Sequence, residues 1–102
     1  MNDRDSINRE LTALLHTRRS SLIADVEVLR GFVTNTIPRA TARDSAHRLA
    51  GTLGLFGLGS LGSDAREIED ELASPSFEFA SESLLVRIEG FSTRATRELF
   101  TD

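Results

Sequence analysis

The sequence predicts an all-α fold, an antiparallel up-down bundle of helices in a single domain over residues 1–102. Apolar residues recur at intervals of three and four along most of the chain, which places them on one face of a helix. No segment alternates apolar and polar residues over a useful length, so no strand is expected. The connections between the helical segments are short, which makes neighbouring helices run in opposite directions.

The first third of the chain carries two apolar stripes that share one helical phase. The stripes consist of Ile7, Leu11, Leu14 and Leu15, and then of Leu22, Val26, Leu29, Phe32 and Val33. The polar stretch HTRRSS separates them, and Ser20 or Ser21 can cap a new helix there. We expect a break at this point, with a short extra N-terminal helix before it. The alternative is one helix that runs on through the polar stretch.

The segment TNTIPRA indicates the end of one helix and the start of the next. Thr36 can act as the N-cap, and Pro38 suits the first turn because an N–H at that position has no partner within the helix. The apolar stripe of this helix, over residues 38–56, consists of Ala42, Ala46, Leu49, Leu53 and Phe56. Gly57 and Gly59 are expected to end it, with Gly57 in a left-handed conformation.

Serine residues are expected to begin the last two helices. Ser60 is the expected cap of a helix whose stripe consists of Leu61, Ala65, Ile68 and Leu72. Ser74, which precedes Pro75, is the expected cap of the final helix. The stripe of that helix runs to the C-terminus and consists of Phe77, Ala80, Leu84, Ile88, Phe91, Ala95 and Leu99.

The composition excludes several classes of function. The chain has no cysteine, which rules out disulfides, thiolate metal sites and cysteine nucleophiles. Its net charge of −4, together with the absence of Tyr and Trp, argues against nucleic-acid binding. No apolar run approaches the roughly 20 residues of a membrane span, and the polar start MNDRDSINRE is unlike a signal peptide. We therefore expect a cytoplasmic protein with neither a nucleic-acid nor a membrane partner.

The stretch AHRLAGTLGLFG, residues 46–57, combines a histidine with three glycines. Each interior glycine costs a helix about 0.5–1 kcal/mol relative to alanine. His47 is expected at or beyond the edge of the buried face, with Gly51 and Gly54 one and two turns after it. Bare backbone there would let another molecule approach the imidazole. The alternative is that the glycines let two helices of the bundle pack closely. His16 has no glycine one turn later, and we assign it no role.

AHRLAGTLGLFG followed by LGSLGSDAREIEDEL resembles the signature of the histidine phosphotransfer (HPt) family. The matching positions are His47, Leu49, Gly51, Phe56, Gly57, Leu61, Ala65, Ile68 and Glu69. The resemblance covers essentially the whole chain and implies an antiparallel up-down four-helix bundle. It also implies a phosphocarrier of a two-component phosphorelay. In that role, His47 would accept a phosphoryl group and exchange it with the aspartate of response-regulator receiver domains, with a hybrid histidine kinase as a further partner.

The resemblance also implies roles for residues around His47. Glu69 stands where members of the family place the group that orients the histidine; without the resemblance it would be one more solvated acid in EIEDEL. The usual lysine, three residues after the histidine, is Ala50 here. Arg43 and Arg48 are therefore the candidates for phosphoryl charge support, unless they serve only solubility. The expected docking surface consists of Gly51, Gly54 and Ala50.

The chain is not expected to be an enzyme in its own right. It contains neither a glycine-rich nucleotide loop with a lysine nor a metal-ligand cluster in its sequence, so we expect no cofactor in this chain. Mg²⁺ is expected in the partner receiver domain, whose aspartate and metal would supply the catalysis. We expect a monomer. Two alternatives stay open: a scaffold of the same fold that binds a receiver domain or kinase without carrying phosphate, and a plain helical dimerisation unit.

Overall fold

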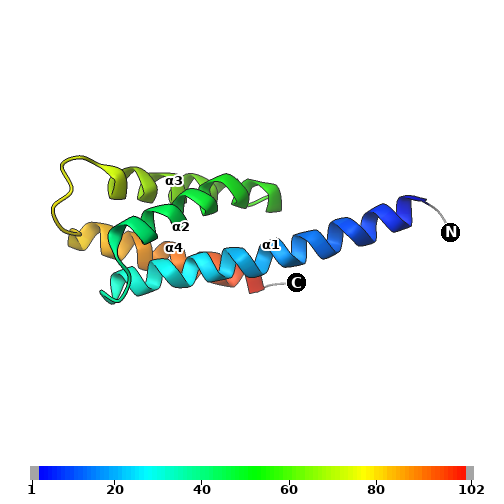
Figure 1. Ribbon diagram of the computed structural model, residues 1–102, viewed down its shortest axis with the longest axis horizontal. Coiled ribbons are helices and arrows are strands. Elements are labelled where there is room, and N and C mark those ends of the chain that lie inside the picture. Colours follow the sequence, from blue (N-terminus) through cyan, green and yellow to red (C-terminus); the bar gives the residue numbers. More distant parts are fainter. Residues whose placement is uncertain (1–2, 101–102) are drawn as a thin grey trace.

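The computed structural model describes residues 3–100, which form four α-helices and one 3₁₀ turn, with no strand among them (Figure 1). The elements are α1 (Asp3–Val33), α2 (Arg39–Thr52), the 3₁₀ helix η1 (Leu53–Phe56), α3 (Gly59–Ala73) and α4 (Glu82–Phe100). Each α-helix packs against the next one in the sequence, and α4 also packs against α1. The predicted all-α class is therefore confirmed, with four helices around a common core.

The predicted stripes form the core of the bundle. The buried side chains are Leu22, Val26 and Leu29 of α1; Ala42, Ala46 and Leu49 of α2; Leu53 of η1; Leu61, Ala65, Ile68 and Leu72 of α3; and Leu84, Ile88, Phe91, Ala95 and Leu99 of α4. Four other residues of the predicted stripes pack against this core while only partly buried: Phe32, Val33, Phe77 and Ala80. The predicted stripe of Ile7, Leu11, Leu14 and Leu15, and the side chain of Phe56, lie outside the described side chains.

The expected break near Ser20 is wrong, because α1 runs from Asp3 to Val33 without interruption. The polar stretch contains neither glycine nor proline, and both stripes share one phase, so nothing there forces the backbone out of the helix. The Thr17 hydroxyl donates to the carbonyl of Ala13, one turn earlier, at 3.1 Å. The outer turns of α1 extend well beyond the other helices (Figure 1). No described helix is both long enough and apolar enough to cross a membrane.

The predicted caps of α2 and α3 are also wrong. Pro38 occupies the N-cap position of α2, and no side chain caps this helix. The Thr36 hydroxyl instead donates to the carbonyl of Gly31 at 3.0 Å, so it serves the end of α1. Leu58 occupies the N-cap position of α3, and Ser60 lies inside the helix. Periodicity alone does not distinguish a polar residue at a helix start from one just inside it.

The last helix begins later than predicted. Ser74 does not cap it, since its hydroxyl accepts from the backbone N–H of Ser76 at 3.3 Å within the connection over 74–81. The cap is Ser81, whose hydroxyl accepts from the N–H of Leu84 at 3.1 Å. Phe77 continues the apolar spacing of α4 but packs against the core from the connection. That spacing is why the sequence predicts an earlier start.

Two residues with left-handed backbone follow helices. Gly57, with φ 73°, follows η1 as predicted, whereas Gly59 begins α3 instead of ending the preceding helix. Asn35, with φ 64°, follows α1. There the N–H of Thr36 donates to the carbonyl of Gly31 at 2.8 Å, and the N–H of Asn35 donates to that of Phe32 at 3.1 Å. This is the Schellman arrangement, and it turns the chain sharply from α1 towards α2.

Candidate functional site

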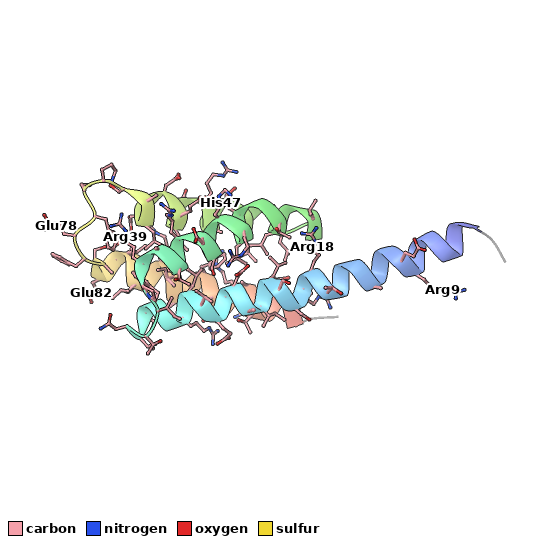
Figure 2. The ribbon with its side chains drawn as sticks, viewed as in Figure 1. Arg9, Arg18, Arg39, His47, Glu78 and Glu82 are labelled. Carbon is pink, nitrogen blue, oxygen red and sulfur yellow. The ribbon has the colours of Figure 1, made fainter. Side chains whose placement is uncertain are left out.

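His47 stands on the outside of α2, beside α3 (Figure 2). Its side chain is 74% exposed, and Nδ1 lies 2.6 Å from Oε2 of Glu69, whose side chain is 23% exposed. An ionised carboxylate only accepts hydrogen bonds, so in the neutral ring the proton is on Nδ1, which donates to Glu69. Nε2 then keeps its lone pair. Among the described residues it has no hydrogen-bond partner, and it lies open to an approaching molecule.

Buried neighbours fix the positions of both members of this pair. Ala46 and Ile68, each 0% exposed, hold α2 and α3 in the core. His47 and Glu69 each follow one of these residues by one position, a rotation of about 100° around the helix axis. Both side chains therefore stand just outside the contact between α2 and α3. The packing of two helices thus brings the pair together without placing either ionisable group in the core.

The glycines beside His47 are not required by packing within the chain. Gly51 and Gly54 are exposed, and an added Cβ atom at either would meet nothing within 4 Å. The close contact between α2 and α3 occurs instead at Gly62, where an added Cβ would lie 3.5 Å from the carbonyl oxygen of Ala50. The alternative that Gly51 and Gly54 allow these helices to pack closely is therefore not supported. They leave bare backbone on the surface.

Arg48 does not fit the predicted role of phosphoryl charge support, because its guanidinium is bound to α1. Its Nη2 lies 2.8 Å from Oδ1 of Asp25, and its Nε lies 3.2 Å from both carboxylate oxygens. The same Nη2 donates to the hydroxyl of Ser45 at 3.1 Å. Asp25 and Ser45 are buried. The hydrogen bonds that Arg48 donates to Asp25 raise the pKa of Arg48 above its ordinary value.

The other two arginines of α2 have different surroundings. Arg43, one turn before His47, is exposed and lies 3.7 Å from Asp44, an exposed pair of the kind that contributes little to stability. Arg39 donates to the carbonyls of Leu72 at 2.6 Å and Ser74 at 3.0 Å. It also lies over the ring of Phe77. Arg39 therefore joins the start of α2 to the end of α3, and α2 offers fewer available cations than its sequence predicts.

A shallow depression of about 140 Å³ lies beside the glycines, and its lining includes Ala50, Gly54, Gly62, Ser63 and Arg66. The sequence signature includes no role for Arg66. The signal that would have found it is its spacing from Glu69, because residues three apart on a helix are neighbours on its surface. The depression therefore joins two predicted docking residues, Ala50 of α2 and Gly54 of η1, to a cation on α3.

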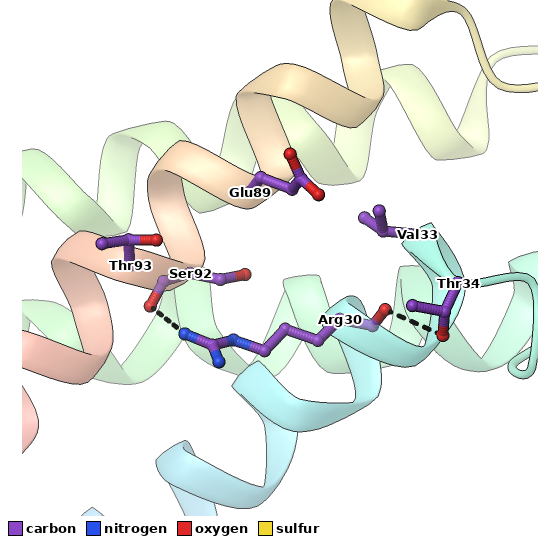
Figure 3. Close-up of a pocket in the computed structure, with 6 residues that line it drawn as sticks. All are labelled: Arg30, Val33, Thr34, Glu89, Ser92 and Thr93. Atoms are coloured by element: carbon purple, nitrogen blue, oxygen red, sulfur yellow. Dashed lines mark hydrogen bonds between the residues drawn. The ribbon is translucent and has the colours of Figure 1, made fainter.

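A separate hollow of about 350 Å³ lies between α1 and α4 (Figure 3). It is lined by Arg30, Val33, Thr34, Glu89, Ser92 and Thr93. Arg30 donates across it to the carbonyl of Ser92 at 3.5 Å. Neither α2 nor α3 contributes to this lining, so the hollow is distinct from the His47–Glu69 pair. In the part of the chain whose side chains are described, no group of three or more acidic or histidine residues is arranged to hold a metal ion.

Comparison of the chain with protein-family models, with curated proteins and with solved structures finds no match. The resemblance to the HPt family therefore stays a prediction based on the sequence signature. The geometry around His47 is an independent observation, which any proposal of function has to explain.

Proposed function

We propose that the chain is a histidine phosphotransfer protein of a two-component phosphorelay that carries a phosphoryl group on Nε2 of His47. The observation that carries this proposal is the 2.6 Å contact of an exposed imidazole with Glu69. The contact orients the ring and leaves the outer nitrogen nucleophilic. The bare backbone of Gly51 and Gly54 supports docking of a receiver domain or of a hybrid histidine kinase at this face.

In the proposed transfer, the lone pair of Nε2 attacks the phosphorus atom of an aspartyl phosphate on the receiver domain. The N–P bond forms while the bond from phosphorus to the carboxylate oxygen breaks, and the aspartate leaves with that electron pair. The proton on Nδ1 stays in place, so the ring gains positive charge. The carboxylate of Glu69 offsets this charge at 2.6 Å. The reverse step returns the phosphoryl group to an aspartate and regenerates the neutral imidazole.

This chain would contribute a positioned nucleophile and a docking surface, and would not be an enzyme by itself. The Mg²⁺ that supports transfer would belong to the receiver domain, where it neutralises the phosphoryl oxygens. The proposal includes an antiparallel up-down order of the four helices. Short connections such as residues 34–38, and the packing of each helix against the next, support that order (Figure 1). It also includes a monomeric, cytoplasmic protein.

The test is phosphoryl transfer from receiver domains charged with acetyl phosphate. We expect wild type and His16→Ala to gain an acid-labile, base-stable label, and His47→Ala to gain none, because His47 alone supplies the nucleophile. His16→Ala is the matched control, since these are the only two histidines in the chain. Circular dichroism should show that both variants keep the helical content of wild type. A label that persists on His47→Ala, or its absence from wild type across a broad panel of charged receivers, would contradict the proposal.

A second candidate is a scaffold that binds a receiver domain or kinase without carrying phosphate. It is favoured by Ala50 in place of the usual lysine and by the bonding of Arg48 to Asp25, which together leave few cations on α2. The scaffold predicts receiver binding by wild type with no label on His47. The same panel of receivers therefore separates the two functions when binding is measured alongside transfer.

A further inference from the structure

A phosphoryl group on His47 needs a cation near it. It would bring negative charge to a position close to the Glu69 carboxylate, and like charges at such distances repel each other. Of the three arginines of α2, Arg43 has its guanidinium 3.7 Å from the carboxylate of Asp44, and the other two have closer partners. Arg48 is bound to Asp25 and Arg39 to backbone carbonyls. The structure therefore raises the question of which other element supplies the charge.

Arg66 on α3 is an exposed arginine whose charge is available. Among the described residues it has no hydrogen bond or ion pair, whereas two arginines that α4 directs towards α3 are both occupied. Of these, Arg87 lies 3.4 Å from Glu71, and Arg94 pairs with Asp64. Arg66 thus differs from its neighbours in keeping its guanidinium free for an incoming anion.

The position of Arg66 follows the contact between α2 and α3. Glu69 meets His47, and three residues earlier on α3 Arg66 lines the same depression as Ala50, three residues after His47. Residues three apart on a helix have Cβ atoms about 5–6 Å apart, so Arg66 stands one turn from the pair along this contact. The small side chain of Ala50 and the bare backbone of Gly54 leave the space between them open.

We propose that Arg66 is the phosphoryl-binding cation of this site and acts from α3 across Ala50. This inference rests on the proposed function, because it concerns phosphate carried by His47. With the phosphoryl group on Nε2, the guanidinium donates N–H bonds to two of its oxygens, in the two-pronged geometry that suits arginine. No covalent bond to Arg66 forms or breaks. The HPt family, which the chain resembles, usually has a lysine on the histidine helix. In this chain the neighbouring helix, α3, supplies the cation instead.

The experiment compares Arg66→Gln with wild type in the rate of transfer from a charged receiver domain and in the lifetime of the phosphohistidine. We expect transfer to slow by about tenfold or more, because charge-assisted hydrogen bonds are lost in the transition state. The matched control is Arg18→Gln, which removes the same charge from an exposed position on α1 and should leave the rate unchanged. Thermal unfolding should give wild-type melting temperatures for both variants.

Rescue separates a phosphoryl contact from a structural effect. Adding Ala50→Lys to Arg66→Gln restores a cation from α2, and we expect it to recover most of the lost rate. A wild-type rate and lifetime in Arg66→Gln would overturn the proposal, as would a loss that Ala50→Lys leaves unrepaired. A loss in Arg43→Gln with none in Arg66→Gln would assign the role to Arg43. Wild type that takes no label overturns the proposed function itself, so the two failures are distinguishable.

Discussion

The contact between His47 and Glu69 joins a largely exposed ring to a carboxylate that is mostly covered. The partial burial of the Glu69 side chain limits the rotamers that it can adopt. Its carboxylate therefore holds the imidazole ring more firmly than a solvated carboxylate would. The ring in turn stays accessible because its own helix neighbour, Gly51, has no side chain. One member of the pair supplies rigidity and the other supplies access.

Replacing Glu69 tests this division. Glu69→Ala leaves Nδ1 without its acceptor, so the ring rotates and either nitrogen can carry the proton. We expect the rate of transfer to His47 to fall by about 10- to 100-fold, a size typical of lost orientation. Glu69→Gln keeps an acceptor oxygen and should retain more of the rate. The melting temperature should stay close to that of wild type, because the core does not include Glu69. An unchanged rate in Glu69→Ala would remove its assigned role.

Side chains near His47 differ in how far the sequence could predict them. Glu69 was found because a family signature relates it to the histidine. The pair of Arg48 with Asp25 could not be predicted, because Asp25 lies on another helix and helical periodicity carries no information about contacts between distant segments. The position of Arg66 beside Ala50 could not be predicted either, because it depends on how α3 lies against α2. Local patterns predict which face a residue occupies, but not which residue it meets across a helix contact.

Between α1 and α2, a polar cluster interrupts the apolar packing. The hydroxyl of Ser45, which is 0% exposed, donates to Asp25 at 3.1 Å and accepts from Arg48. Buried polar groups are tolerated when each has a partner, and here the three side chains satisfy one another. The cluster therefore fixes how α1 lies against the helix that carries His47.

Asp25→Ala should destabilise this contact. It leaves the buried Ser45 hydroxyl without an acceptor and Arg48 without its counter-ion, and we expect the free energy of unfolding to fall by about 1–3 kcal/mol. Urea denaturation followed by circular dichroism measures the loss. The matched control is Glu27→Ala on the exposed side of α1, where the pair with Arg30 is 4.0 Å long. That change should stay within about 0.5 kcal/mol. Equal losses in the two variants would contradict the importance of the cluster.

Helix interiors and the left-handed Gly57 were predictable, whereas the capping residues at the helix starts were not. Spacing identified the buried stripe of α3, for example, because burial of one face repeats with each turn of the helix. Helix ends depend on backbone angles and on which carbonyl a hydroxyl reaches. Thr36 binds the end of α1, and Ser81 caps α4 although Ser74 precedes the proline. A serine or threonine near a boundary is thus evidence of a boundary, but not of its position.

On the surface of the whole molecule, the proposed receiver-binding face is marked by missing side chains, at Gly51 and Gly54. Gly51→Leu would place a bulky side chain beside His47 and should weaken receiver binding by about tenfold or more through steric clash. The fold should persist, because an added Cβ meets nothing within 4 Å and leucine favours helix. Gly90→Leu is the matched control: this exposed glycine on α4 also has open space around it. Isothermal titration calorimetry of both variants and wild type with one receiver domain measures the difference in binding affinity. Undiminished binding by Gly51→Leu would exclude this surface.

The uninterrupted α1 has a mechanical consequence. From Asp3 to Leu22, its first buried side chain among those described, the helix rises by about 29 Å at 1.5 Å per residue. This part of α1 is held at its C-terminal side, where Asp25 pairs with Arg48 of the helix that carries His47. A twist or tilt applied to the first turns of α1 would be transmitted along this length to the contact between Asp25 and Arg48. The long N-terminal part of α1 is thus a stiff extension whose movement would act on the helix that carries His47.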